Sequence, residues 1–459
     1  MSNTVGDRGG QKPGSGSRPA PRPMPGSVGM GGPGGGLSNS QSPPFTVPMR
    51  YMVLGILGFF LFAIDMVFES SRLGQGMPLQ PAVVSMTHML TLGSLLAFVM
   101  GAVYQLSTVA FLIPLSNVSV ARYNFWLYAV GVIGLISSMA VWWTPGLIVF
   151  GSLVTLSLYI FVAVMLMSIR KTTVKGPVVW FIQWAHVYLA AAVTAALLLV
   201  VSFAVPVIGT VFQELLWTHI ILATGGFFTF LILGFSYKLL PMFTLSHGFS
   251  TKRQPWTFAF AQIAIWGLLF GIWSHVAAVT IGGGVFGIAT FMNQGLDFRG
   301  IYKKRLRRRT EAPMITAMSA IGGGVLAILG LVVLSFGRQG LAGWQAVVTF
   351  YLLGWITLTV MSYAYKIVPF LVWTKRYSVG VEKGKTPLIK DMIDVERARP
   401  VFIVFVVGLL LLAVSGGLAF VPGVMIASVL CAVAIVWFCW QLARVLSIRT
   451  LGKELMVRD

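Results

Sequence analysis

Residues 226–241 read GFFTFLILGFSYKLLP, and residues 354–369 read GWITLTVMSYAYKIVP. In both stretches a glycine is followed by ten mostly apolar residues, then by tyrosine and lysine, with a proline four residues after the tyrosine. Residues 93–105, GSLLAFVMGAVYQ, have the same glycine-to-tyrosine spacing with glutamine in place of lysine. The glycines are 133 and 128 residues apart, which predicts that one unit of about 130 residues is used three times.

The composition is that of a membrane protein, because 57% of the 459 residues are apolar and only 10% are charged. An apolar helix of about 20 residues crosses the roughly 30 Å hydrocarbon core. Twelve such runs occur, near residues 51–69, 82–114, 123–143, 146–168, 178–204, 215–242, 256–275, 277–297, 314–336, 342–373, 400–420 and 422–444. The glycine–tyrosine stretches fall on the second, sixth and tenth runs. We therefore expect an all-α membrane protein with twelve transmembrane helices in three pseudo-repeats of four.

The net charge of +21 lies almost entirely on one side of the predicted membrane. With both termini in the cytoplasm, every lysine and arginine except Arg72 and Arg338 falls in an inner segment or at an inner helix end. This asymmetry is the usual orientation signal of a multi-pass protein, here placed in the cell membrane. We expect the basic clusters at 299–309 and 375–399 to contact anionic lipid headgroups. The charge pattern indicates no nucleic-acid partner.

Two tails flank the predicted membrane domain of residues 49–446. Residues 1–48 contain 12 glycines and 9 prolines, so they cannot bury enough apolar surface to offset their ordering entropy. We expect a disordered cytoplasmic tail there and a second cytoplasmic tail at residues 447–459. Cys431 and Cys439, eight residues apart in the last span, match neither a metal-binding pair nor a disulfide and are predicted core residues.

The five histidines are the first candidates for a functional site, because ionisable side chains at membrane depth are costly. His88 and His219 lie near the outer ends of spans two and six, and His275 ends span seven. We expect the three to share a layer in the outer third of the membrane, where neutral imidazoles can bind haem iron or copper. The alternative is that each donates to a carbonyl or caps a helix. His186 and His247 are predicted to be structural.

Lys238 and Lys366 occupy matching positions near the inner ends of spans six and ten. Long basic side chains there can reach the cytoplasmic headgroups, and the alternative is a proton path. The glycine runs at 282–284 and 322–324 predict close helix packing. The remaining polar candidates lie close to span ends and are Asp65, Asn293, Gln294 and Asp297.

The twelve spans in three repeats of four, the cytoplasmic termini and the outer histidines on spans two, six and seven together resemble subunit I of the haem–copper oxidase superfamily. This superfamily includes terminal oxidases, nitric-oxide reductases and NnrS-like proteins. The resemblance covers residues 50 to about 445 in architecture, and residues 219–246 and 354–373 are most similar to the smaller relatives. It implies that His88 matches a ligand of a low-spin haem. It also implies that His219 and His275 match copper ligands.

The chain departs from the family pattern at several ligand positions. Span seven of the family supplies two adjacent histidines, whereas here Ser274 precedes the single histidine. Span ten supplies two haem histidines, and residues 342–373 contain none. Ala223 stands where the enzymes often carry tyrosine or glutamate. Without a span-ten ligand a high-spin haem cannot be attached in the family manner, which argues against full oxygen reduction.

Three functions stay open from the sequence. The first is binding of haem, copper or both in a redox, respiratory, nitrosative-stress or metal-handling role. The second is transport of a small molecule or metal, since internal repeats are usual in transporters. The third is a cofactor-free assembly or structural subunit that associates with other respiratory or membrane subunits.

The third repeat has Val347 and Thr349 where the first two have histidines.

Overall fold

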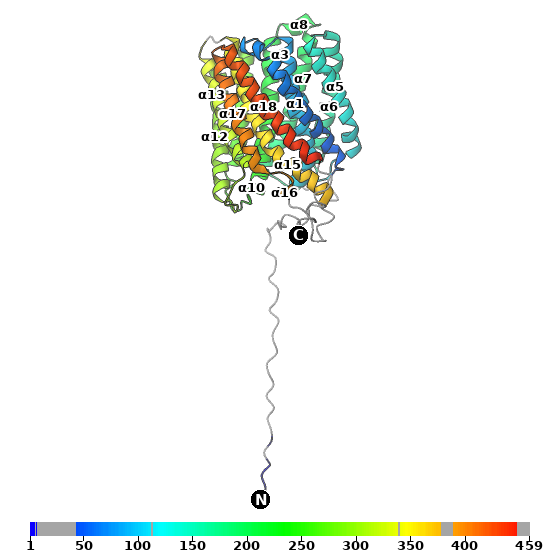
Figure 1. Cartoon of the computed structure of the whole chain (residues 1–459), viewed down its shortest axis with the longest axis vertical. Helices are drawn as coiled ribbons and strands as arrows, with labels where there is room; N and C mark the ends of the chain where they lie inside the picture. The colour runs from blue at the N-terminus through cyan, green and yellow to red at the C-terminus, as the bar shows by residue number, and fades with distance from the viewer. Residues whose placement is uncertain (5, 7–42, 112, 338–339, 378–388, 448–459) are drawn as a thin grey trace. The chain divides into compact units, whose positions relative to one another are not determined.

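The computed structural model describes residues 1–4, 6, 43–111, 113–337, 340–377 and 389–447 (Figure 1). Backbone contacts divide the chain into residues 1–37 and 38–459, and every helix belongs to the second unit. Most of the predicted N-terminal tail, at residues 7–42, lies outside the described residues, as do residues 448–459 and Arg338. The two tails therefore stay predictions.

Eleven helical runs in the described ranges are long and apolar enough to cross a membrane. Three of them join two α-helices through a π-helix, namely α3–η1–α4 (Pro81–His88, Met89–Leu96, Ala97–Phe111), α9–η2–α10 (Phe212–Ile220, Ile221–Thr229, Phe230–Thr244) and α14–η3–α15 (Leu341–Phe350, Tyr351–Thr357, Leu358–Tyr377). The others are α1 (Thr46–Phe68), α5 (Val118–Ala140), α6 (Thr144–Ile169), α7 (Pro177–Ser202), α11 (Gln254–Ser274), α13 (Ala312–Ser335), α17 (Ala398–Gly417) and α18 (Val421–Ser447). These runs make the chain an all-α, multi-pass membrane protein.

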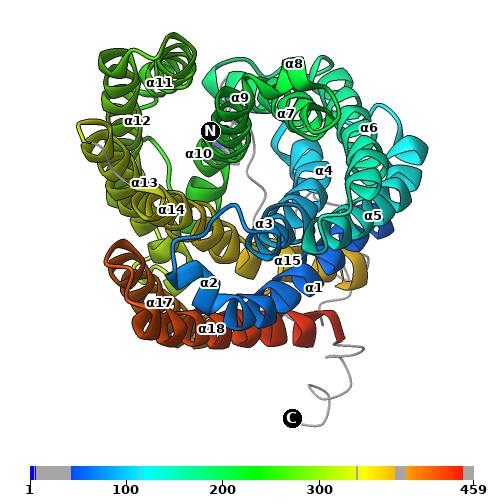
Figure 2. The same cartoon turned by 90° about the horizontal axis from the view of Figure 1, so that it is seen from above.

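The span predicted at 277–297 forms part of α12 (Ala277–Lys303), which is not among the eleven. Its 27 residues are enough to cross a membrane, but its glycines and the polar residues Asn293, Gln294 and Asp297 lower its hydropathy. The helix packs between α11 and α13 (Figure 2). The count of twelve transmembrane helices therefore stays a prediction.

The short helices mark the two ends of the bundle. In Figure 1, α8 (Pro206–Gly209) lies at one end and α16 (Ile389–Met392) at the other, and we term these the α8 end and the α16 end. The remaining short elements are α2 (Ser70–Gly74) and a 3₁₀ turn (Val395–Arg397). Because successive long helices run in opposite directions, the basic residues that the structure describes gather toward the α16 end, with Arg72 at the α8 end.

A π-helix occurs in each of the three glycine–tyrosine stretches, and it contains the glycine that begins the stretch. Gly93 lies in η1, Gly226 in η2 and Gly354 in η3. One extra residue in the turn rotates the residues before a π-helix relative to those after it, and such segments are frequent at functional sites. The sequence repeat therefore coincides with a repeated distortion of the backbone.

Glycine allows very close helix contacts at the places where the sequence predicts them. A Cβ atom on Gly58 would lie 2.2 Å from the carbonyl oxygen of Gly93, and one on Gly323 would lie 2.5 Å from that of Gly354. The first and third stretches thus use the same contact between a π-helical glycine and a glycine of the preceding long helix. A Cβ on Gly283 would likewise lie 2.6 Å from the backbone of α11.

The tyrosines of the repeat are part of the core. Tyr104, Tyr237 and Tyr365, which end the three stretches, are all buried. Cys431 and Cys439 are also buried and form no disulfide, as predicted for core cysteines.

Candidate functional site

His88 and His219 lie opposite each other, although 130 residues separate them in the sequence. His88 is the last residue of α3 and directly precedes η1, and His219 lies two residues before η2. Their ring centres are 6.3 Å apart, and the ring planes differ by only 7°. The structure therefore places two of the three histidines that were predicted to share a layer next to each other.

A backbone carbonyl fixes the orientation of each ring. The Nδ1 atom of His88 is 2.8 Å from the carbonyl oxygen of Val84, one turn earlier in α3. The Nδ1 atom of His219 is 3.0 Å from the carbonyl oxygen of Ala192 in α7. A carbonyl oxygen can only accept, so both Nδ1 atoms carry the hydrogen and both Nε2 atoms keep a lone pair. Within the described ranges, neither Nε2 receives a hydrogen bond.

The distance between the two ring centres is one that two imidazoles bound to a single metal would have. Both imidazoles donate to a carbonyl, which is the structural role that the sequence left open for each histidine, and histidines that bind metals also usually donate the other ring N–H in this way. A metal–imidazole bond is about 2.0–2.1 Å long and the ring centre lies roughly 1.1 Å behind the nitrogen, so the two centres would be about 6.3 Å apart. The observed separation of 6.3 Å agrees with this value.

The number of protein ligands favours haem over a bare metal ion. Among the residues that the structure describes, no group of three or more His, Cys, Asp or Glu side chains could hold a metal ion. Zinc and copper sites usually take three or more protein ligands. A haem brings four nitrogen donors of its own and needs only axial ligands from the protein.

The third predicted ligand, His275, has a different partner. It caps the C-terminal end of α11 in the left-handed conformation, with φ of 55°. Its Nε2 atom is 3.3 Å from Oε1 of Glu214, and its side chain is 75% exposed. It therefore forms an acid–imidazole pair at the α8 end.

The other two histidines lie apart from the pair. His186 is fully buried in α7, with Nδ1 2.7 Å from the carbonyl oxygen of Ile182. Its ring packs 5.3 Å from that of Phe161, and no described residue hydrogen-bonds its buried Nε2. His186 thus has the same kind of anchor without a second imidazole. His247 is exposed in the loop after α10.

Lys238 and Lys366 have different surroundings despite their matching positions. Lys238 is exposed on α10. Lys366, whose side chain is only 11% exposed, forms an ion pair with Glu311. Oε1 of Glu311 also lies 2.7 Å from Nη1 of Arg307. The acidic partner precedes α13 and was not indicated by any motif.

Three of the polar candidates near span ends join helices inside the bundle. The Tyr237 hydroxyl donates to Oδ2 of Asp297 over 2.8 Å, which links α10 to α12. The side-chain amide of Asn293 donates to the Thr257 hydroxyl over 2.8 Å, which links α12 to α11. Gln294 is fully buried beside them. Asp65, in α1, is half-buried near the α8 end.

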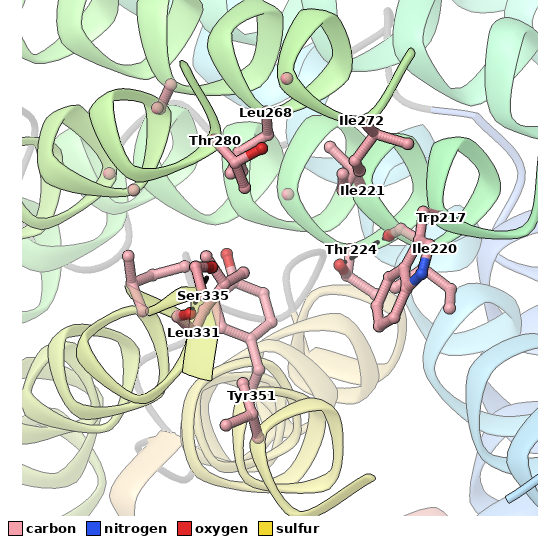
Figure 3. Close-up of a pocket in the computed structure, with 18 of the residues that line it drawn as sticks. Trp217, Ile220, Ile221, Thr224, Leu268, Ile272, Thr280, Leu331, Ser335 and Tyr351 are labelled. Atoms are coloured by element: carbon pink, nitrogen blue, oxygen red, sulfur yellow. Dashed lines mark hydrogen bonds between the residues drawn. The ribbon is translucent and has the colours of Figure 1, made fainter. Parts of the chain in front are cut away.

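A cavity of about 740 Å³ lies on the other side of the helix that carries His219. Its walls come from α9, η2, the first residue of α10, α11, α12, α13, α14 and the first residue of η3. Trp217, Ile221 and Thr224 line it, as Figure 3 shows, whereas His219 contacts α7 and His88. The cavity and the imidazole pair are therefore separate candidate sites on opposite faces of one helix.

Comparison with models of known protein families finds no match for this chain, and no curated protein matches it. Its function is therefore inferred from its own residues. Among them, the paired imidazoles are the strongest indication of a cofactor.

Proposed function

We propose that this protein is a haem-binding redox protein of the membrane, in which His88 and His219 would hold one haem iron through their Nε2 atoms. The observation that carries the proposal is the near-parallel pair of rings, 6.3 Å apart, with both Nδ1 atoms anchored on carbonyls. A haem bound there would supply one-electron oxidation and reduction.

The surrounding residues would prepare both ligands for metal binding. The carbonyls of Val84 and Ala192 hold each imidazole in the tautomer with the lone pair on Nε2. The hydrogen bond from His219 to α7 also orients that ring from outside its own helix. A π-helix follows each histidine, and its extra residue rotates the histidine relative to the rest of the span.

Two histidines on one iron would favour electron transfer over reduction of oxygen or nitric oxide. A catalytic metal needs an open coordination position for its substrate, whereas His88 and His219 together would occupy the positions at which a haem iron takes a substrate. The absence of histidine from residues 342–373 agrees with this role, because no family-type ligand is present there for a second haem.

We also infer a distant relation to the haem–copper oxidase superfamily, with twelve spans in three repeats and cytoplasmic termini. The π-helix in each repeat and the shared glycine contact of the first and third repeats support the repeat. The gathering of basic residues toward the α16 end supports the orientation in the cell membrane and contact with anionic lipids there. We do not extend the proposal to copper, because His275 pairs with Glu214.

The direct test is an absorption spectrum of the full-length protein, purified in detergent from cells supplied with a haem precursor, before and after reduction. We expect about one six-coordinate, low-spin haem per chain, and no comparable amount of copper by metal analysis. His88→Ala and His219→Ala should each remove most of the haem, because one axial ligand would be lost.

His186→Leu is the matched control, since it removes a buried histidine that has the same carbonyl anchor but no facing imidazole. It should keep the haem at the wild-type ratio. A colourless wild-type protein from haem-replete cells would overturn the proposal and favour a cofactor-free subunit. Retention of haem in both alanine variants would show that the haem is bound elsewhere.

A further inference from the structure

The cavity beside η2 is deeper than half of the hydrocarbon core of a bilayer. Its lining residues on α12 extend from Ala277, at the α8 end, to Phe291. At 1.5 Å per residue this is about 21 Å, compared with roughly 15 Å for half of the hydrocarbon core. A single acyl chain therefore fits its depth.

The walls of the cavity are suited to hydrocarbon. Most of the lining side chains are aliphatic or aromatic, among them Leu268, Ile272 and Leu331 (Figure 3). Several hydroxyls in the wall are already satisfied by carbonyls of their own helices. These bonds are 2.7 Å for Thr224, 2.8 Å for Thr290 and 2.9 Å for Ser335. Because these hydroxyls already have hydrogen-bond partners, they do not need a polar ligand, and an apolar chain can lie against them.

The α8 end of the cavity has the chemistry of an ammonium site. Glu214 is the only carboxylate among the lining residues, which include no lysine or arginine. Trp217, one turn further along α9, and Trp344 of α14 also line the cavity, with ring centres 5.3 Å apart. Indole faces together with a carboxylate attract ammonium and quaternary ammonium groups.

We propose that this cavity holds one acyl chain of a phospholipid whose head carries an ammonium group, of the ethanolamine or choline type. The ammonium lies against Glu214 and the two indoles, and the chain extends toward Phe291. His275 competes with the ammonium for the Glu214 carboxylate, to which it is paired at 3.3 Å. A head with net negative charge is disfavoured by the same carboxylate.

This site does not depend on the proposed haem. His219 faces α7, away from the cavity that Trp217 and Thr224 line. A variant carrying both His88→Ala and His219→Ala should therefore bind the lipid as the wild type does. The two proposals can fail separately.

The test uses quenching of tryptophan fluorescence by lipids with brominated chains. The full chain is placed in nanodiscs of fixed composition that contain a small fraction of brominated lipid, with either an ethanolamine or a glycerol head. We expect the site to bind the ethanolamine lipid roughly tenfold more tightly than the glycerol lipid, measured as the ratio of lipid fractions that give equal quenching. The reason is that the ammonium contacts a carboxylate and indole rings at a partly desolvated site. Trp217→Phe and Trp344→Phe should each reduce the quenching, which assigns the signal to the cavity.

Four variants decide the outcome. Glu214→Gln should abolish the head-group preference, and His275→Ala should increase it. Leu331→Phe should reduce quenching by both lipids, because it fills the path of the chain. The matched control, Asp65→Asn, changes a carboxylate near the α8 end that does not line the cavity and should leave all of these values unchanged. The head-group site would be overturned by equal quenching with both lipid heads in the wild type, or by an unchanged preference in Glu214→Gln. The chain site would be overturned by full quenching in Leu331→Phe.

Discussion

The sixth and tenth spans are built on the same plan but hold different side chains. Both have a π-helix around a glycine, followed eleven residues after that glycine by tyrosine and lysine. Span six has His219 before its π-helix, whereas span ten has Val347 and Thr349 in that region. Val347 lines the apolar cavity, while His219 faces His88. The comparison teaches that the distorted helix belongs to the scaffold and that the histidine is a separate feature placed on it.

The largest expected effect comes from deleting one residue of a π-helix. Deletion of Ala223 should turn η2 into regular α-helix and rotate His219 by about 100° relative to α10. We expect this variant to lose most of its haem, measured as the haem-to-protein ratio after size-exclusion chromatography. Deletion of Leu353 in η3 is the matched change and should keep the haem, because span ten supplies no ligand. If the folded Leu353 deletion loses haem to the same extent, the two spans do not differ as proposed.

A smaller effect is expected from His219→Met, which should retain a bound haem with a changed axial ligand. Histidine–methionine ligation raises the reduction potential of haem iron relative to two histidines. A redox titration followed by absorbance should therefore show a midpoint shifted to more positive values. Val347→Met in span ten should leave the midpoint unchanged. An unshifted midpoint in the His219→Met protein would argue that this residue is not a ligand.

The smallest effect concerns the lysines that follow the tyrosines. Lys366→Met should destabilise the fold by about 1–3 kcal/mol, because it removes a mostly buried partner of Glu311. Lys238→Met should change stability by less than about 0.5 kcal/mol, since that lysine is exposed. Thermal unfolding in detergent measures both. Equal losses in the two variants would contradict the different environments described for these lysines.

Much of the fold could be predicted from the sequence, because hydrophobic length alone identifies membrane helices. Each predicted span coincides with a helix, including the one at 277–297, whose polar residues lower its hydropathy. The π-helices could not be predicted in this way. Apolar composition is the same for α and π turns, so hydrophobic length does not distinguish them.

The site could be predicted only in part. The sequence indicates how deep a residue lies in the membrane, but not toward which neighbouring helix its side chain points. The sequence predicted His88 and His219 in one layer of the membrane. In any α-helix the carbonyl of Val84, four residues before His88, lies close enough to accept a hydrogen bond from the His88 ring. The carbonyl of Ala192 and the facing of the two rings depend on how α3, α7 and α9 pack. The partner of His275 was missed because Glu214 lies 61 residues away, on another helix.

The central claim, that the two imidazoles bind one iron, is tested most directly by electron paramagnetic resonance of the frozen, oxidised protein. Near-parallel imidazole planes, which differ here by 7°, predict a rhombic low-spin ferric signal that disappears in His88→Ala and His219→Ala. His186→Leu should leave that signal unchanged. A high-spin ferric signal, or no haem iron in protein from haem-replete cells, would contradict the claim.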